Sequence, residues 1–171
     1  MYIKDVTLNT LHCTLLCLLA LLLAFPAWAD CVRDPQGPCL TPDPALTPGA
    51  VDPRVTQATI QQTICEKGYT KTIQHTSGKL KVQIYRRYGG RERSPHAEVD
   101  HRIPLEVGGA DVAENLWIQR YDTAPWNAHL KDRLEHLMRR KVCAGELTLA
   151  EGQAVFLGDW RTGYVKFLGA P

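Results

Sequence analysis

A run of apolar residues near the start of the chain decides which part of the sequence is available to fold. It extends over residues 11–25, is broken by Pro26 and ends in Ala-Trp-Ala at residues 27–29. This order is typical of a secretory signal peptide with a small-residue cleavage site. The alternative is a membrane anchor, but a run of about 15 residues is shorter than the roughly 20 needed to span a bilayer. We therefore expect residues 1–29 to be a cleaved signal peptide.

Four cysteines follow that segment, at Cys31, Cys39, Cys65 and Cys143. An even number of cysteines in an exported chain predicts two disulfides, formed in the oxidising periplasm or outside the cell. Three pairings exist in principle. Cys31 and Cys39 lie close together on either side of a segment with Pro and Gly, so we pair them with each other and pair Cys65 with Cys143. A zinc site is the alternative, but the sequence has no Cys-x-x-Cys step.

The exported chain divides into a leader and one domain. Residues 30–53 hold six of the 11 prolines, which excludes a helix or a central strand there. We expect residues 30–54 to be an extended, loosely tethered leader and residues 55–171 to form the domain, since a chain of this length suits one domain.

The first part of the domain is only partly decided by its pattern. Residues 55–63 are expected to form a short helix. Residues 76–88 fit either a strand or a helix, because their apolar residues recur at both periods. Ser77 as a cap and Gly89 as a stop favour the helix.

Clearer signals follow. Residues 98–105 and 115–119 are expected to form two short strands. Asn127 is a helix cap, and Thr148 with Glu151 makes a capping box that opens another helix towards Trp160. An apolar stripe runs along the helix that Asn127 begins, at Leu130, Leu134, Leu137, Met138 and Val142. This order predicts an α+β fold with a small hairpin surrounded by helices.

Polar residues in the hairpin region are spaced as a catalytic set. Asp100 and His101 are adjacent, Asn115 comes 14 residues after His101, and His129 comes 14 residues after Asn115. An imidazole can take a proton from water near neutral pH. An Asp oxygen and a His nitrogen can hold a divalent cation whose other positions stay open to water and a phosphate.

This set resembles the HNH nucleases, the ββα-metal or His-Me finger group. In that group a hairpin carries Asp-His, a Gly-Gly loop and an Asn-Leu strand follow, and a helix carries the last His. The corresponding residues here are Asp100-His101, Gly108-Gly109, Asn115-Leu116 and His129. Over about residues 64–167 the chain is also similar to small exported bacterial HNH proteins, through Trp117, Ala128, Lys131-Asp132, Val142-Cys143-Ala144-Gly145 and Asp159-Trp160.

The resemblance implies a ββα-metal core and a role for each residue. His101 is the general base, and Asn115 fixes the loop that orients it. Asp100 and His129 are the ligands of a divalent metal, with Mg²⁺ expected first and Mn²⁺ or another transition metal as alternatives. The interval from Asn115 to His129 is longer than in many members of the group. Alternative ligands therefore stay open at Glu98, Asp132 and His136.

Nucleic acid is the expected partner, with DNA ahead of RNA. The formal net charge is only +2, so phosphate binding must come from local groups, and Arg102 and Arg120 flank the motif. Nothing resembles a base-reading module, which predicts weak sequence specificity. Two alternatives are a non-catalytic nucleic-acid- or envelope-binding protein on the same scaffold and a secreted interaction domain.

Overall fold

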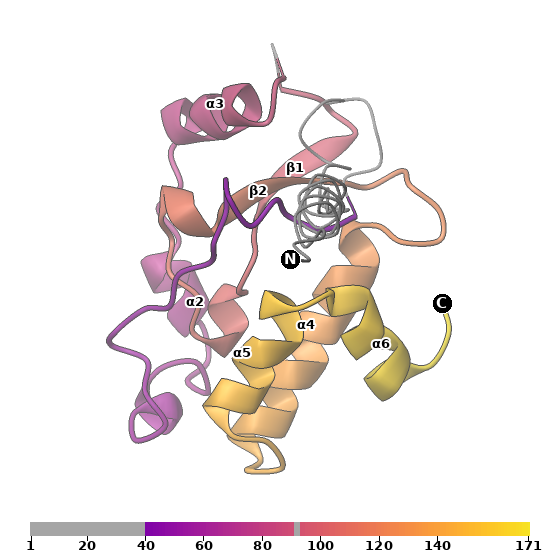
Figure 1. Ribbon diagram of the computed structural model, residues 1–171. Helices are drawn as coiled ribbons and strands as arrows, with labels where there is room; N and C mark the ends of the chain where they lie inside the picture. Colours follow the sequence, from indigo (N-terminus) through magenta and orange to yellow (C-terminus); the bar gives the residue numbers. More distant parts are fainter. Residues whose placement is uncertain (1–39, 91–92) are drawn as a thin grey trace, which may run out of the picture.

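The computed structural model describes residues 40–90 and 93–171 (Figure 1). Its two strands, β1 (Ala97–His101) and β2 (Leu116–Arg120), pair antiparallel. The predicted α+β class is confirmed. The remaining elements are η1 (Ile60–Gln62), α2 (Tyr69–Ile73), α3 (Gly78–Arg87), η2 (Leu105–Val107), η3 (Ala113–Asn115), α4 (Ala128–Cys143), α5 (Leu149–Leu157) and α6 (Trp160–Leu168).

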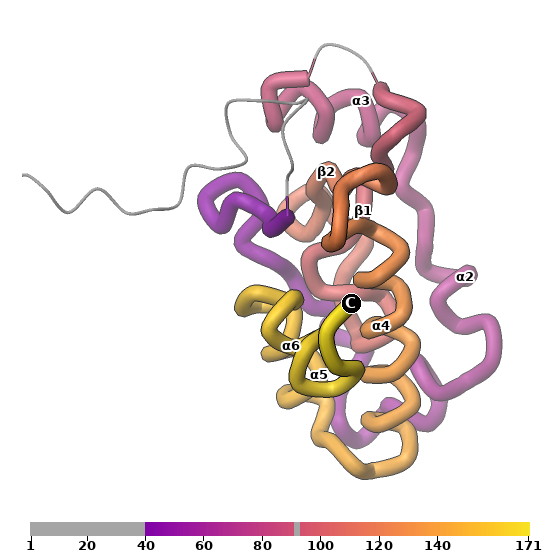
Figure 2. Tube along the Cα trace, turned by 90° about the vertical axis from the view of Figure 1, so that its right-hand side faces the viewer, coloured from indigo at the N-terminus to yellow at the C-terminus, as the bar shows by residue number. Residues whose placement is uncertain are grey.

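The hairpin lies between two groups of helices. Helix α3 packs on both strands, while α4, α5 and α6 gather on the other side, as both views show (Figures 1 and 2). The α3 side is closed by a core of Ile84, Tyr85, Tyr88, Leu116, Trp117 and Ile118. The other side is closed by Ile103, Val107, Leu134, Met138, Phe156, Trp160 and Tyr164. The strands therefore pack in the first core, and the loop between them joins the second core through Ile103 and Val107.

Local signals set most helix ends. The Ser77 side chain accepts a hydrogen bond from the backbone N–H of Leu80, 3.1 Å away, so residues 76–88 form a helix and not a strand. Asn127 caps α4 in the same way, at 3.2 Å from the Leu130 N–H. Both side chains satisfy a backbone donor that the first helical turn leaves unpaired.

Two predicted helices differ in extent. Thr148 and Glu151 form the expected capping box, but α5 ends at Leu157. The side chain of Asp159 then caps the separate helix α6. Residues 55–63 contain only the single 3-10 turn of η1. The predicted helix towards Trp160 is thus divided in two, because Asp159, directly after Gly158, caps the start of α6.

The end of the Pro-rich segment is attached more firmly than predicted. Gly49 N–H donates to the Glu114 carbonyl at 3.0 Å, and Asp52 N–H donates to the Gly108 carbonyl at 2.9 Å. Val51 forms a β-bridge with Gly109. The expectation of a loose leader is therefore wrong for residues 40–54, because the residues between its prolines keep the N–H groups that pair with the hairpin loop. The boundary placed at residue 54 stays a prediction.

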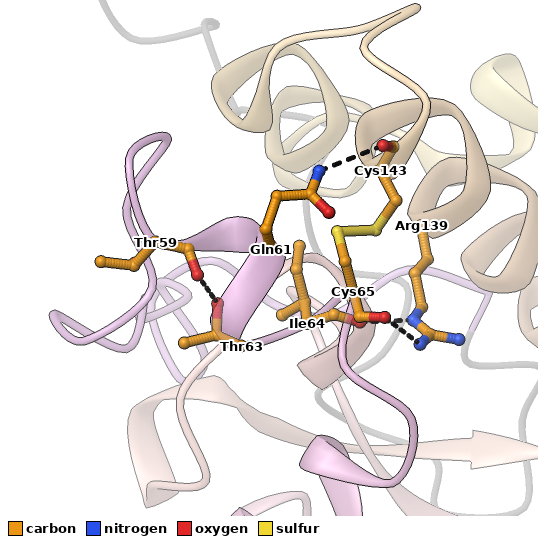
Figure 3. The surroundings of a disulfide bond; sticks show 7 residues. All are labelled: Thr59, Gln61, Thr63, Ile64, Cys65, Arg139 and Cys143. Carbon is orange, nitrogen blue, oxygen red and sulfur yellow. Dashed lines mark hydrogen bonds between the residues drawn. A yellow bond between two sulfur atoms is a disulfide. The ribbon is translucent and has the colours of Figure 1, made fainter.

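The disulfide between Cys65 and Cys143 is confirmed (Figure 3). It joins the segment before α2 to the last residue of α4, across 78 residues of sequence. Arg139 lies beside it and donates from Nε to the Ile64 carbonyl at 2.5 Å. Gln61 Nε2 donates to the Cys143 carbonyl at 3.3 Å. The bridge is compatible with a periplasmic or secreted protein.

The two other sequence predictions on export lie outside the described residues. These are the signal peptide at 1–29 and the Cys31–Cys39 pair. Within residues 40–90 and 93–171, no helix has the length and apolar character needed to cross a membrane.

Candidate functional site

Asn115 closes the loop that joins the two strands. Its side chain is fully buried, and its Nδ2 donates to the carbonyls of Ile103 and Ala110, both at 2.8 Å. Its Oδ1 accepts from the Ile103 N–H at 2.9 Å and from the Ala50 N–H at 3.4 Å. A Cβ on Gly109 would lie 1.8 Å from the Ile103 carbonyl oxygen, so only glycine fits there. The loop following His101 is thus fixed by one amide side chain.

His101 is paired with an aspartate that the sequence analysis did not single out. Its Nε2 lies 2.8 Å from Asp111 Oδ1, and the residue is 6% exposed. The same carboxylate accepts hydrogen bonds from the His75 N–H, at 2.5 Å, and from the Thr76 hydroxyl. Burial opposes the charge of Asp111, but these three hydrogen bonds outweigh it and hold the pKa of Asp111 well below its usual range.

The charge on Asp111 determines which nitrogen of His101 is basic. An ionised carboxylate only accepts hydrogen bonds, so Nε2 of His101 must be the donor of the pair. In the neutral form of an imidazole that donates from Nε2, the lone pair is on Nδ1. This is the carboxylate–imidazole pairing of a catalytic triad with the roles of the two ring nitrogens exchanged. It equips His101 to act as a general base.

Asp100 faces a buried lysine. Lys131 comes from α4, and its ammonium donates to Asp100 Oδ2 at 2.6 Å, to the His101 carbonyl at 2.8 Å and to the Glu135 carboxylate. The other oxygen of Asp100 accepts from the His101 N–H at 2.7 Å. Burial alone would lower the pKa of Lys131, but the carboxylates of Asp100 and Glu135 outweigh it and raise that pKa. The ammonium is therefore charged at neutral pH.

Glu98, Tyr121 and His129 form a polar row next to Asp100. The Tyr121 hydroxyl donates to Glu98 at 2.9 Å, and its ring stacks on that of His129 with centroids 5.1 Å apart. Burial, reinforced by the Asp100 charge, raises the pKa of Glu98 to about 7. Gln119 pairs with Glu98 in the strand register, and its buried amide hydrogen-bonds to none of the described residues. This face of the hairpin therefore holds a buried amide whose donor and acceptor are unpaired among the described residues.

The side chains near Asp100 do not present a metal site as they stand. In the described part of the chain, no group of three or more His, Cys, Asp or Glu side chains is placed to hold an ion. Both carboxylate oxygens of Asp100 accept hydrogen bonds, one of them from an ammonium. His129 is exposed and stacks on Tyr121. A two-ligand site on Asp100 and His129 stays a prediction.

The two arginines proposed for phosphate contact make internal contacts. Arg102 donates to the carbonyls of Thr47, at 2.7 Å, and Leu157, at 2.5 Å. It thereby ties the Pro-rich segment to the end of α5. Arg120 forms an ion pair with Asp122 at 2.8 Å. Their role towards a nucleic acid stays a prediction.

No family model, curated protein or solved structure matches this chain. Of the residues at this site, Asp111 was not named by the sequence analysis, and Lys131 was named only through the similarity to exported HNH proteins, without a role. Lys131 had a detectable signal, because it lies three residues before Leu134 and so continues the apolar stripe of α4.

Proposed function

We propose that the chain is an exported phosphodiester hydrolase of the HNH type that cleaves DNA with weak sequence specificity. One observation carries the proposal. At the end of β1, a buried imidazole is held by an ionised aspartate, beside Asp100 and within a loop that Asn115 fixes. A histidine held in this way suits the removal of a proton from water.

The chain's own residues supply the proton transfer. Nδ1 of His101 accepts the proton of the attacking water, and Asp111 stabilises the imidazolium that forms. Asn115 keeps the loop in place, so the imidazole does not have to be ordered at the moment of reaction. The implied product is DNA with 5′-phosphate ends, as in the nucleases that the motif resembles.

A divalent metal, Mg²⁺ first, is the cofactor that the resemblance implies, and it would stabilise charge on the phosphate oxygens. Asp100, which the resemblance makes a ligand of this metal, is engaged by Lys131 and by the His101 N–H. The proposed partner is nucleic acid, and the proposed location is the periplasm or the outside of the cell.

Plasmid digestion by the oxidised protein tests the proposal, with Mg²⁺, with Mn²⁺ and with chelator. His101→Ala is expected to lower the cleavage rate by about 10²- to 10⁴-fold while the fold survives. His96→Ala is the matched control, since His96 lies just before β1 and its side chain is 64% exposed. It should cleave at nearly the wild-type rate.

Three results would change the proposal. Equal cleavage by folded His101→Ala and wild type would remove His101 as the base. Cleavage of RNA but not DNA by the wild type would replace the substrate. A folded wild type that binds nucleic acid and cleaves neither would favour the non-catalytic binding protein.

A further inference from the structure

Lys131 is the centre of a buried charge cluster. Its side chain is 1% exposed, and its three ammonium protons have three acceptors, namely Asp100, Glu135 and the His101 carbonyl. Its Nζ also lies 5.6 Å from the centroid of the Phe156 ring. All three N–H donors of the ammonium are therefore satisfied inside the protein, without water.

The cluster around this ammonium is rich in carboxylates. Asp100 and Glu135 touch it, and both have side chains that are 13% exposed. Glu98 lies two residues before Asp100 on the same strand, and Asp132 directly follows Lys131 on α4. Carboxylates held this close repel one another unless a cation lies among them. In the described chain, Lys131 is the cation in contact with Asp100.

We propose that Lys131 is the resident cation of this cluster, at the position on Asp100 that the resemblance gives to a divalent metal, and that it keeps metal affinity there low. A metal on Oδ2 of Asp100 would share that oxygen with an ammonium 2.6 Å away, and a metal on Oδ1 would bind the same carboxylate as that ammonium. The two positive charges would repel each other across a buried site, where screening is weak. Lys131 is thus a positioning residue for Asp100 and a competitor of the metal.

The inference rests on the proposed function, because the metal position on Asp100 comes from it. Its test measures metal binding and does not depend on cleavage. Mn²⁺ binding is measured by titration calorimetry on the wild type, Lys131→Met and Lys141→Met. Lys141 is the matched control, because it lies on the same helix and pairs with Glu146 at 2.6 Å, outside the cluster. Lys131→Met is expected to bind Mn²⁺ at least about tenfold more tightly than wild type, and Lys141→Met should match wild type.

A folded Lys131→Met with unchanged or weaker Mn²⁺ affinity would overturn the inference. So would a wild type that already binds Mn²⁺ at micromolar concentration and loses this binding in Asp100→Asn. If Lys131→Met does not fold, the double variant Lys131→Met/Glu135→Leu replaces it, because it removes Lys131 together with its carboxylate partner on α4 and keeps Asp100 for the metal. That variant should also bind Mn²⁺ more tightly, and unchanged binding would again overturn the inference. Cleavage is not measured, so a failed nuclease test leaves this result independent.

Discussion

Removing the Asn115 side chain should destabilise the protein far more than an ordinary polar substitution. Asn115→Ala leaves three backbone groups of the loop without their close partner, the N–H and carbonyl of Ile103 and the carbonyl of Ala110, all bonded at 2.9 Å or less. Each buried group left unpaired costs about 1–3 kcal/mol. A water entering the cavity would restore part of this. The expected loss is about 3–5 kcal/mol of a total that is typically about 5–15 kcal/mol.

Urea denaturation of the oxidised protein measures this loss. With a slope of about 2 kcal/mol per molar urea, the midpoint of Asn115→Ala should fall by about 2 M. Asn127→Ala is the matched control, because the Asn127 side chain accepts from the Leu130 N–H and donates to the Thr123 carbonyl, both at 3.2 Å and in a partly buried place, and the variant should lose about 1 kcal/mol. If the two variants have the same midpoint, the argument that Asn115 fixes the loop is wrong.

Three further perturbations follow from the structure. Replacing Cys65 and Cys143 together by Ala should lower the free energy of unfolding by about 4 kcal/mol, because the bridge closes a loop of 78 residues; a urea midpoint equal to that of the wild type would contradict this. Glu98→Gln should gain stability over wild type as the pH rises from 4.5 to about 7, since the folded-state pKa of Glu98 is raised and its ionisation opposes folding in that window. Because Glu98 is partly exposed, the gain should be about 1 kcal/mol. The difference in urea midpoint between Glu98→Gln and wild type is measured at pH 5 and at pH 8, and the same difference at both would refute the prediction. Gly109→Ala should unfold at a markedly lower temperature, because its Cβ would overlap the Ile103 carbonyl, and an unchanged melting temperature by circular dichroism would show that the loop yields.

The parts of the fold that the sequence predicts are those controlled by neighbours in the chain. The cap at Asn127 and the capping box at Thr148 each involve residues within one helical turn, so a short window contains the whole interaction. The same holds for α3, where Ser77 decides between two periodicities. By contrast, the attachment of residues 40–54 depends on partners at Gly108, Gly109 and Glu114. Proline content alone carries no information about those partners.

The candidate site shows the same division. His101 and Asn115 are predicted from their motif. The residues that orient His101 are not, because they lie elsewhere in the sequence or in a segment with no distinctive pattern. Asp111 lies in a loop ten residues after His101, and it is held by His75 and Thr76, which come from the connection between α2 and α3. Nothing in the local pattern of residue 111 distinguishes it from a turn aspartate. Its role follows only from the packing of that connection against the hairpin loop.

Successive residues of a strand point to opposite faces, and this rule explains how one strand end serves two purposes. Asp100 turns towards α4 and meets Lys131, whereas His101 turns towards Asp111. Lys131 nevertheless touches both residues, because it also binds the His101 carbonyl. Substitution of Lys131 should therefore disturb the strand end that carries Asp100, while Asp111→Asn should alter the imidazole and the connection that holds His75 and Thr76. A changed Mn²⁺ affinity in Lys131→Met, together with a changed pH profile of cleavage and an unchanged Mn²⁺ affinity in Asp111→Asn, would assign the two faces of β1 to different parts of the chemistry.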